Sequence, residues 1–142
     1  MQAGREIKFR VWDGVLQYMI YSEESRSISS FFADVEGKEK MNVMQFTGLR
    51  DKNGKEIFEG DILKQNYRAE TGSYDDRISY EGHHIGPVII TASKGVCMKN
   101  PLCYSVETDE INRSRQYKNV ASYRCEIIGN KFSNPELLEV GK

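Results

Sequence analysis

The chain has 142 residues, which suits one domain whose hydrophobic core needs neither disulfides nor a metal. Charged residues make up 29% and hydrophobic residues 39%, with 11% aromatics, which argues against a disordered chain. The 20 Lys and Arg are balanced by 21 Asp and Glu, so no global basic excess points to nucleic-acid binding, although a local basic patch is still compatible with this balance.

The N-terminal segment predicts a β-hairpin over residues 6–21. Asp13-Gly14 suits a two-residue turn, because Asp and Gly tolerate the positive φ that such a turn requires. The strand before it alternates with the period of a half-buried strand, with Ile7, Phe9 and Val11 on one face and Lys8, Arg10 and Trp12 on the other.

The next segment predicts a loop followed by a strand. Residues 22–40 are rich in Ser and Glu and indicate a loop or a short irregular segment. Residues 41–47 return to a strand pattern, which we expect Gly48 to end.

Residues 51–55 predict a second turn with Asn53-Gly54 at its tip. Ile57-Phe58 resumes the apolar pattern, residues 59–61 turn again, and residues 62–67 predict another strand.

The segment 66–87 is polar and leaves two alternatives open. It is either a mobile excursion or a strand pair with a solvated face. After it, residues 88–92 and 96–98 predict a hairpin around a Ser93–Gly95 turn, which residues 102–106 extend.

The C-terminal part is less regular. Residues 107–121 are polar, and a helix from Thr108 fits them without a clear apolar stripe. Residues 123–128 predict a last strand that Gly129 ends, and Asn134-Pro135 predicts the start of a helical turn.

Many short strands, Gly-bearing turns and no linker predict a single mainly β domain over residues 1–142. We expect a small SH3-like barrel or a curled antiparallel sheet, with long loops, a short C-terminal helical turn and a polar insert at 66–87. The N-terminus has no signal-peptide h-region, and no apolar run approaches the ~18 residues of a membrane helix. The odd count of three cysteines favours reduced thiols, so we expect a cytoplasmic protein without a membrane anchor.

Three blocks in this order resemble the YopX family of phage and prophage proteins. They are residues 5–13 (REIKFRVWD), residues 44–62 (MQFTGLRDKNGKEIFEGDI), and residues 126–130 (EIIGN) with 134–138 (NPELL). The resemblance implies a β-rich fold with an SH3-like component, a phage or prophage origin in a bacterial host, and self-association. It implies no reaction, catalytic residue or cofactor. The chain departs from the family pattern in a tighter turn at Asp13-Gly14 and in an extended polar segment from Arg68 to Gly86.

The two histidines, His83 and His84, are weak candidates for a metal site. Adjacent strand residues point to opposite faces, and Asp75, Asp76 and Glu81 nearby give no spacing typical of zinc or of a facial triad. A solvated loop explains the same residues. Residues 51–62 do not fit a calcium loop, because positions six and twelve would be Glu56 and Ile62.

No nucleophile motif, Walker sequence or Rossmann fingerprint occurs, and we expect no catalytic, cofactor or metal-binding residue. Cys97, Cys103 and Cys125 sit in or beside apolar strands, which indicates buried, unreactive thiols. Glu59-Gly60-Asp61 could be a carboxylate pair at a site, but a glycine bend followed by an Asp that accepts backbone N–H bonds explains it better.

Two functions of different classes remain in competition. The first is a non-enzymatic accessory protein that acts by contact, as a homo-oligomer or as an adaptor for a host or phage protein. The second is a nucleic-acid-binding barrel, whose basic and stacking residues would be Lys8, Arg10, Arg50, Lys52, Lys55 and Lys64 with Trp12, Tyr18 and Tyr67. Asp51, Glu56, Glu59 and Asp61 lie among these cations, so a salt-bridged surface is the simpler interpretation of them.

Overall fold

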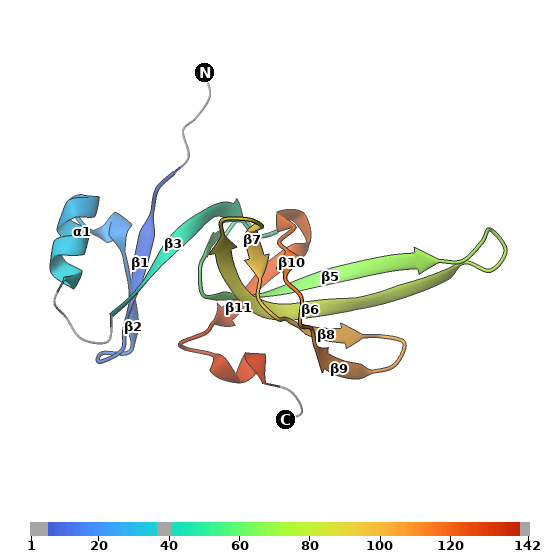
Figure 1. Cartoon of the computed structure of the whole chain (residues 1–142). Coiled ribbons are helices and arrows are strands. Elements are labelled where there is room, and N and C mark those ends of the chain that lie inside the picture. The colour runs from blue at the N-terminus through green and yellow to red at the C-terminus, as the bar shows by residue number, and fades with distance from the viewer. Residues whose placement is uncertain (1–5, 37–40, 140–142) are drawn as a thin grey trace, which may run out of the picture.

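The computed structural model describes residues 6–36 and 41–139 and shows a mainly β protein with one short α-helix in these ranges. A curled antiparallel half-barrel sheet is accompanied by a second antiparallel sheet, and one long hairpin projects from the molecule (Figure 1). The predicted mainly β fold is therefore confirmed, in its curled-sheet form.

The N-terminal sheet has the strand order β2-β1-β3-β4, with neighbouring strands antiparallel. Its strands are β1 (Phe9–Asp13), β2 (Tyr18–Tyr21), β3 (Met41–Arg50) and β4 (Glu56–Phe58). The 3₁₀ helix η1 (Ser22–Glu24) and helix α1 (Ile28–Val35) follow β2.

The first hairpin forms as predicted, but the prediction of a two-residue turn at Asp13-Gly14 is wrong. Asp13 ends β1, and residues 14–17 make a longer loop in which Gln17 takes a φ of 62° and its N–H donates to the Asp13 carbonyl at 2.8 Å. The Asp13 carboxylate also accepts the N–H groups of Val15 and Leu16. This side chain therefore organises a wider turn that keeps its backbone donors bonded.

The half-buried interpretation of β1 is also wrong, because Arg10, Trp12 and Asp13 are all buried. β1 lies between β2 and β3, and its polar-looking face packs against the rest of the molecule. Trp12 stacks on Phe132 with ring centroids 5.5 Å apart, and Arg10 pairs with Asp61.

Residues 28–35 form a helix where a loop was expected. The Ser27 hydroxyl accepts the Ser30 N–H at 3.1 Å as an N-cap. Phe31 is buried, and Phe32 contacts both Phe31 and Phe9 edge to face. Burial of Phe31 and the contacts of Phe32 favour the helix. The Ser-rich composition of this segment had instead indicated a loop. Residues 37–40 of the predicted loop lie outside the described residues.

Gly48 does not end the third strand, because β3 continues to Arg50 through an irregularity where Gly48 adopts a φ of 87°. The turn at 51–55 is confirmed: the Asp51 carboxylate accepts the N–H groups of Asn53 and Lys55, and Gly54 has a φ of 84°.

The second sheet has the order β10-β7-β6-β5-β11, with β8 and β9 added beside β6. Its strands are β5 (Asp61–Thr71), β6 (Ile78–Thr91), β7 (Gly95–Met98), β8 (Leu102–Ser105), β9 (Glu110–Arg113), β10 (Lys118–Asn119) and β11 (Cys125–Asn130). Of the two alternatives for 66–87, the strand pair is correct.

The C-terminal part differs from expectation in two places. Strands β9 and β10 replace the helix considered from Thr108, because each pairs with a neighbouring strand. Gly129 does not end the last strand but lies within β11 beside a register shift. The helical turn after Asn134 is confirmed as the 3₁₀ helix η3 (Pro135–Leu138), and a further 3₁₀ helix, η2 (Ser122–Arg124), precedes β11.

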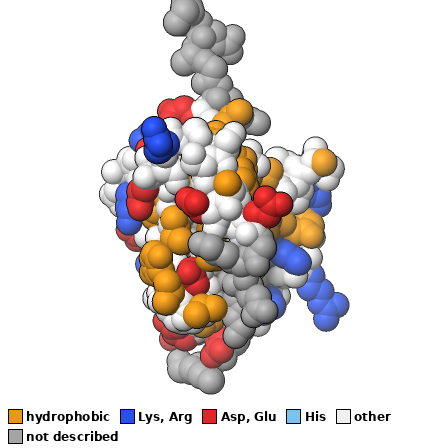
Figure 2. Space-filling view, turned by 90° about the vertical axis from the view of Figure 1, so that its left-hand side faces the viewer, with side chains coloured by type: hydrophobic (Ala, Val, Ile, Leu, Met, Phe, Trp, Pro, Cys, Tyr) orange, Lys and Arg blue, Asp and Glu red, His pale blue; other side chains and the backbone are white. Residues whose placement is uncertain are grey.

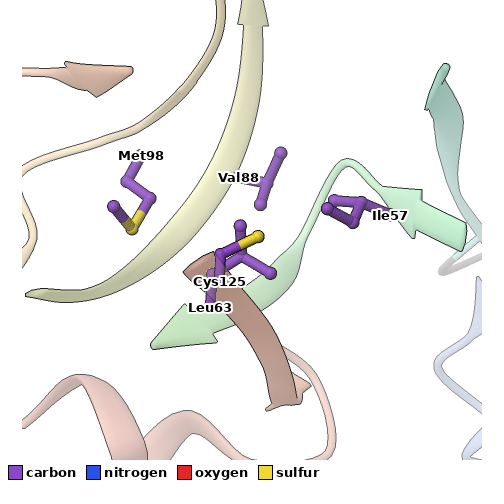
Figure 3. Close-up of a cluster of buried hydrophobic side chains, with 5 residues drawn as sticks. All are labelled: Ile57, Leu63, Val88, Met98 and Cys125. Carbon is purple, nitrogen blue, oxygen red and sulfur yellow. The ribbon is translucent and has the colours of Figure 1, made fainter. Parts of the chain in front are cut away.

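The core lies where β4 meets the second sheet. Five buried side chains from five strands form it, as Figure 3 shows: Ile57, Leu63, Val88, Met98 and Cys125. Around the end of the molecule that carries α1, hydrophobic side chains are interspersed with charged ones (Figure 2). In the described ranges, no helix has the length and apolar character needed to cross a membrane.

Candidate functional site

The most distinctive surface is the projecting hairpin, which we call the arm and define as residues 66–81. Strand β11 pairs with β5 only as far as Gln65, and β8 pairs with β6 only from Gly82. Beyond these points β5 and β6 pair only with each other in the part of the chain that the structure describes, as Figure 1 shows. The arm is therefore a two-stranded ribbon with two open edges.

The arm has one apolar and one charged face. Directly paired residues of antiparallel strands point to the same side, so the pairs Ala69–Tyr80 and Thr71–Ile78 share one face. Tyr80 and Ile78 are 38% and 53% exposed on it. The pair Arg68–Glu81 and Glu70 lie on the other face. This alternation is typical of a strand with a core on one side, yet no core covers the arm among the described residues.

The base of the arm, which we call the root, is organised by Tyr67. The phenol lies across Gly82, donates to the Tyr104 carbonyl at 3.2 Å, and its ring lies 5.0 Å from the His84 ring. A Cβ on Gly82 would come 1.9 Å from the Tyr104 carbonyl oxygen and 2.5 Å from the Tyr67 hydroxyl. Only glycine therefore allows this close packing of β5, β6 and β8.

The two histidines point to opposite faces of β6, as predicted, but they lie in a strand and not in a solvated loop. His83 stacks on Tyr104 at 4.8 Å, whereas His84 packs on Tyr67. Burial, with the positive charges of Lys118 and Arg124, lowers the pKa of His84 to about 4. Burial and Lys64 lower the pKa of His83.

Polar contacts connect the segment before β11 to the root. Gln65 donates to the Asn119 carbonyl at 3.0 Å and accepts the Ala121 N–H at 2.8 Å. Arg124 donates to the Asn66 carbonyl at 3.0 Å, and its guanidinium lies 5.9 Å from the Tyr123 ring. These bonds bring Lys118 and Arg124 beside the start of the arm.

Two hollows open at the root, with volumes of about 600 and 560 Å³. They share Tyr67, Arg68 and Arg124. The first hollow is also lined by His83, Val106 and Tyr123, and the second by Gln65, His84, Cys103 and Lys118. Tyr123 is 80% exposed beside the first. The root therefore offers cations and aromatic rings to a ligand or a partner.

Several of the basic positions considered for nucleic-acid binding on the N-terminal strands and central turns form ion pairs. Lys8 pairs with Glu6, Glu23 and Glu56, and Arg50 pairs with Glu6 and Glu56. The hydrogen bonds that Lys8 donates to the Glu56 and Glu6 carboxylates raise its pKa. Trp12 is buried against Phe132, Tyr18 lies in β2 of the other sheet, and of the predicted aromatics only Tyr67 belongs to the root.

The Glu59-Gly60-Asp61 cluster is structural. Asp61 accepts the Phe58 N–H at 2.8 Å, and Glu59 accepts the Gln45 N–H at 2.9 Å. Asp61 also forms a buried ion pair with Arg10 at 2.9 Å, which the sequence did not reveal. The two carboxylates thus accept hydrogen bonds from different strands and do not form one site.

The cysteines are free thiols; Cys97 and Cys125 are buried, whereas Cys103 is only partly buried at the root. Burial raises the pKa of the Cys125 thiol. Within residues 6–36 and 41–139, no three His, Cys, Asp or Glu side chains gather as a metal site would require. Asp75 and Asp76 lie in the turn at the far end of the arm, away from His83 and His84 in the register of β5 and β6.

Sequence reasoning missed the root because Lys118 comes from the polar segment 107–121, which has no clear pattern, and Arg124 from the start of a predicted strand with no sign of a partner. It also missed the apolar face of the arm. The alternation of Ala69 and Thr71 with Arg68 and Glu70 was the available signal, but the polar composition of 66–87 concealed it.

The profile of the family described as YopX protein matches residues 8–139, which is nearly the whole chain. The chain belongs to the YopX family. The resemblance seen in the three sequence blocks is thereby confirmed.

Among solved structures, the crystal structure of protein EF1440 from Enterococcus faecalis is similar to this YopX-family chain. The two share 22% sequence identity with a TM-score of 0.50, over 96% of this chain and 100% of that one. At this identity the likeness concerns the fold alone. None of the curated proteins matches the chain.

Proposed function

We propose that this YopX-family protein is a non-enzymatic accessory protein of a phage or prophage. It acts in the cytoplasm of the bacterial host through protein contact, and the arm is its contact surface for a second copy of the same chain. The phage setting follows from what the family resemblance implies, and the contact role follows from the arm.

The observation that carries the proposal is the apolar face of a ribbon that stands free. Two-stranded hairpins are marginally stable in water unless a third strand or a packed face supports them. Ala69, Ile78 and Tyr80 give the arm such a face without a covering element in the described part of the chain. Exposed apolar faces and open strand edges are features that proteins ordinarily cover or use for binding.

The experiment compares the full chain with a variant in which residues 68–81 are replaced by Asn-Gly. Tyr67 and Gly82 are directly paired, so a two-residue turn can join them. Light scattering over a range of concentrations should show a mass above that of the monomer for the full chain and a monomer for the shortened one. The unfolding curve of the shortened chain verifies that its body is folded.

Two matched double variants distinguish association through the arm from non-specific association through any exposed apolar residues. Ile78→Ser with Tyr80→Ser should weaken self-association, whereas Val15→Ser with Leu16→Ser, at two positions more than 60% exposed on the first hairpin, should not. A full chain that stays monomeric at every concentration, or a shortened chain that still associates, would contradict the proposal.

Binding of single-stranded nucleic acid is the second candidate, and the root favours it at a place different from the one the sequence suggested. Lys118 and Arg124 form no ion pair within the described residues, and Tyr67 and Tyr123 lie beside them. Cations beside stacking rings are the usual elements of such sites. A labelled oligonucleotide at low salt should then bind the wild type but not Lys118→Ala/Arg124→Gln, with Lys99→Ala as the control. Absence of binding by the wild type excludes this function.

A further inference from the structure

The free edge of the arm has a defined set of backbone groups. The Glu81 N–H donates to the Glu107 carboxylate and the Glu81 carbonyl accepts the Val106 N–H, so both point away from β5. In an antiparallel ladder, the residue opposite Glu81, which is Arg68, must then also point its backbone groups outward. The direction of the backbone groups repeats every second residue along a strand, so those of Asn66 and Glu70 point outward as well.

One of these outward groups is already bonded, which confirms the pattern. The Asn66 carbonyl accepts from Arg124, so pairing by another strand begins beyond it. Arg68 and Glu70 remain as the open part of the β5 edge. Their side chains make exposed contacts: ion pairs at 3.5–3.8 Å with Glu70, Glu81 and Arg77, and a hydrogen bond from Arg68 to the Ser79 hydroxyl at 3.1 Å. Such pairs contribute little to stability, which leaves both charges available to a partner.

The alternation of charge along this edge selects a partner and a register. If β5 of a second copy lies antiparallel to this edge with the two-fold axis at Ala69, Arg68 of each copy faces Glu70 of the other. The outward backbone groups of both strands are then opposite one another. Neighbouring registers that also align these groups place Arg68 against Arg68 or Glu70 against Glu70. Like charges directly opposite are unfavourable, so only the register centred on Ala69 is complementary.

The same register brings the tip of the arm to the root. Strand β11 occupies the β5 edge up to Gln65, and the 3₁₀ helix η2 lies just before β11. A second β5 that pairs along residues 67–71 places its own turn against this point. That turn carries Asp75, Asp76 and Tyr74, which is 91% exposed. At the root, Arg124 lines both hollows, and Lys118 lines the one of about 560 Å³. The two carboxylates of the tip are thus opposite in charge to Lys118 and Arg124 at the root.

We propose that two copies of this chain join by antiparallel pairing of their β5 edges about a two-fold axis at Ala69, and that the tip of each arm enters the root hollow of the other. The arms then form a four-stranded sheet with the two bodies at its ends, an isologous arrangement. Because directly paired residues share a side, the apolar faces of the two arms join on one face of this sheet. This inference rests on the proposed function and adds to it the edge and the register.

The decisive experiment uses two single variants separately and mixed. Arg68→Glu places Glu against Glu70 at both equivalent positions, and Glu70→Arg places Arg against Arg68. Each alone should weaken self-association at least about tenfold, because two favourable pairs become repulsive. When mixed, the two variants restore complementary pairs and should associate as a heterodimer. Lys94→Glu, a charge reversal at an exposed position of the turn between β6 and β7, lies outside the arm and the root and should leave association unchanged.

A cysteine at the axis provides a second measurement. In this register residue 69 faces itself as a non-hydrogen-bonded pair, with Cα atoms about 4.5 Å apart, a spacing that a disulfide accommodates. Ala69→Cys should therefore form a disulfide-linked dimer on mild oxidation, whereas Thr71→Cys on the same face and the wild type should not.

The outcomes separate the two proposals. If the arm is needed for association but the mixture does not associate and Ala69→Cys does not cross-link, the register is wrong while the proposed function stands. If the wild type is monomeric at all concentrations, both are wrong. Association of the mixture together with cross-linking at residue 69 supports the edge, the partner and the register at once.

Discussion

Arg10 shows how far the role of one residue can differ from its appearance in the sequence. It alternates with apolar neighbours as a surface cation would, yet its side chain is 4% exposed. It donates to Asp61 at 2.9 Å and to the Glu59 carbonyl at 3.0 Å, and it lies 4.9 Å from the Phe58 ring. Burial raises the pKa of Asp61, and the charge of Arg10 opposes that effect. The pair fixes how β1 meets the entry of β5, because either charge left alone in this place would be costly.

At the same scale, His84 predicts a dependence of stability on pH. Its pKa in the folded protein is lowered to about 4 from a usual value of 6.5, so the unfolded chain binds the proton more readily. The stabilising contribution of the neutral ring is therefore present above pH 6.5 and is lost as the pH falls toward 4. Urea unfolding at pH 7.5 and pH 4.5 should show a larger loss of stability for the wild type than for His84→Gln. Equal losses would contradict the assignment.

At the scale of elements, the turn after β3 joins two parts of the fold that are far apart in sequence. The Asp51 carboxylate accepts the N–H groups of Asn53 and Lys55 within the turn and that of Ile127 in β11 at 3.0 Å. Burial acts to raise the pKa of Asp51, but these N–H donors outweigh it and lower the pKa. One side chain thereby connects the N-terminal sheet to the last strand.

Replacing Asp51 should therefore destabilise the whole protein. Asp51→Ala leaves three backbone N–H groups without their acceptor, and we expect the free energy of unfolding to fall by about 2–4 kcal/mol. Asp75→Ala, in the exposed turn of the arm, is the matched control and should change it by less than about 0.5 kcal/mol. Denaturant unfolding of both variants measures the difference; a loss no greater than that of the control would show that the carboxylate is dispensable.

At the scale of the whole molecule, the chain combines a packed body with an arm that has no core. The body holds its five central side chains between two sheets, whereas the outer arm consists of exposed residues and ion pairs (Figures 1 and 3). Local stability follows the number of buried apolar contacts, so the arm is expected to open more readily than the body.

Hydrogen exchange should report this difference and its change on association. In dilute solution the amides of Arg68 and Glu70 should exchange fast while those of Leu63 and Met98 are protected. At concentrations where light scattering shows a dimer, the two arm amides should slow by roughly tenfold or more, since they become bonded to a second strand. Unchanged exchange at Arg68 and Glu70 in the dimer would place the contact elsewhere.

Local features of this protein could be predicted from the chain alone: the strands of the core, the Asn53-Gly54 turn, the start of the last helical turn and membership of the YopX family. These depend on short-range periodicity and turn chemistry, which neighbouring residues specify. Only the tertiary structure decided that Arg10 is buried against Asp61, that residues 28–35 are helical, and that Lys118 and Arg124 meet Tyr67 at the root. Each of these depends on burial by segments distant in the chain, and distant burial overrides the local preference of a polar or Ser-rich stretch.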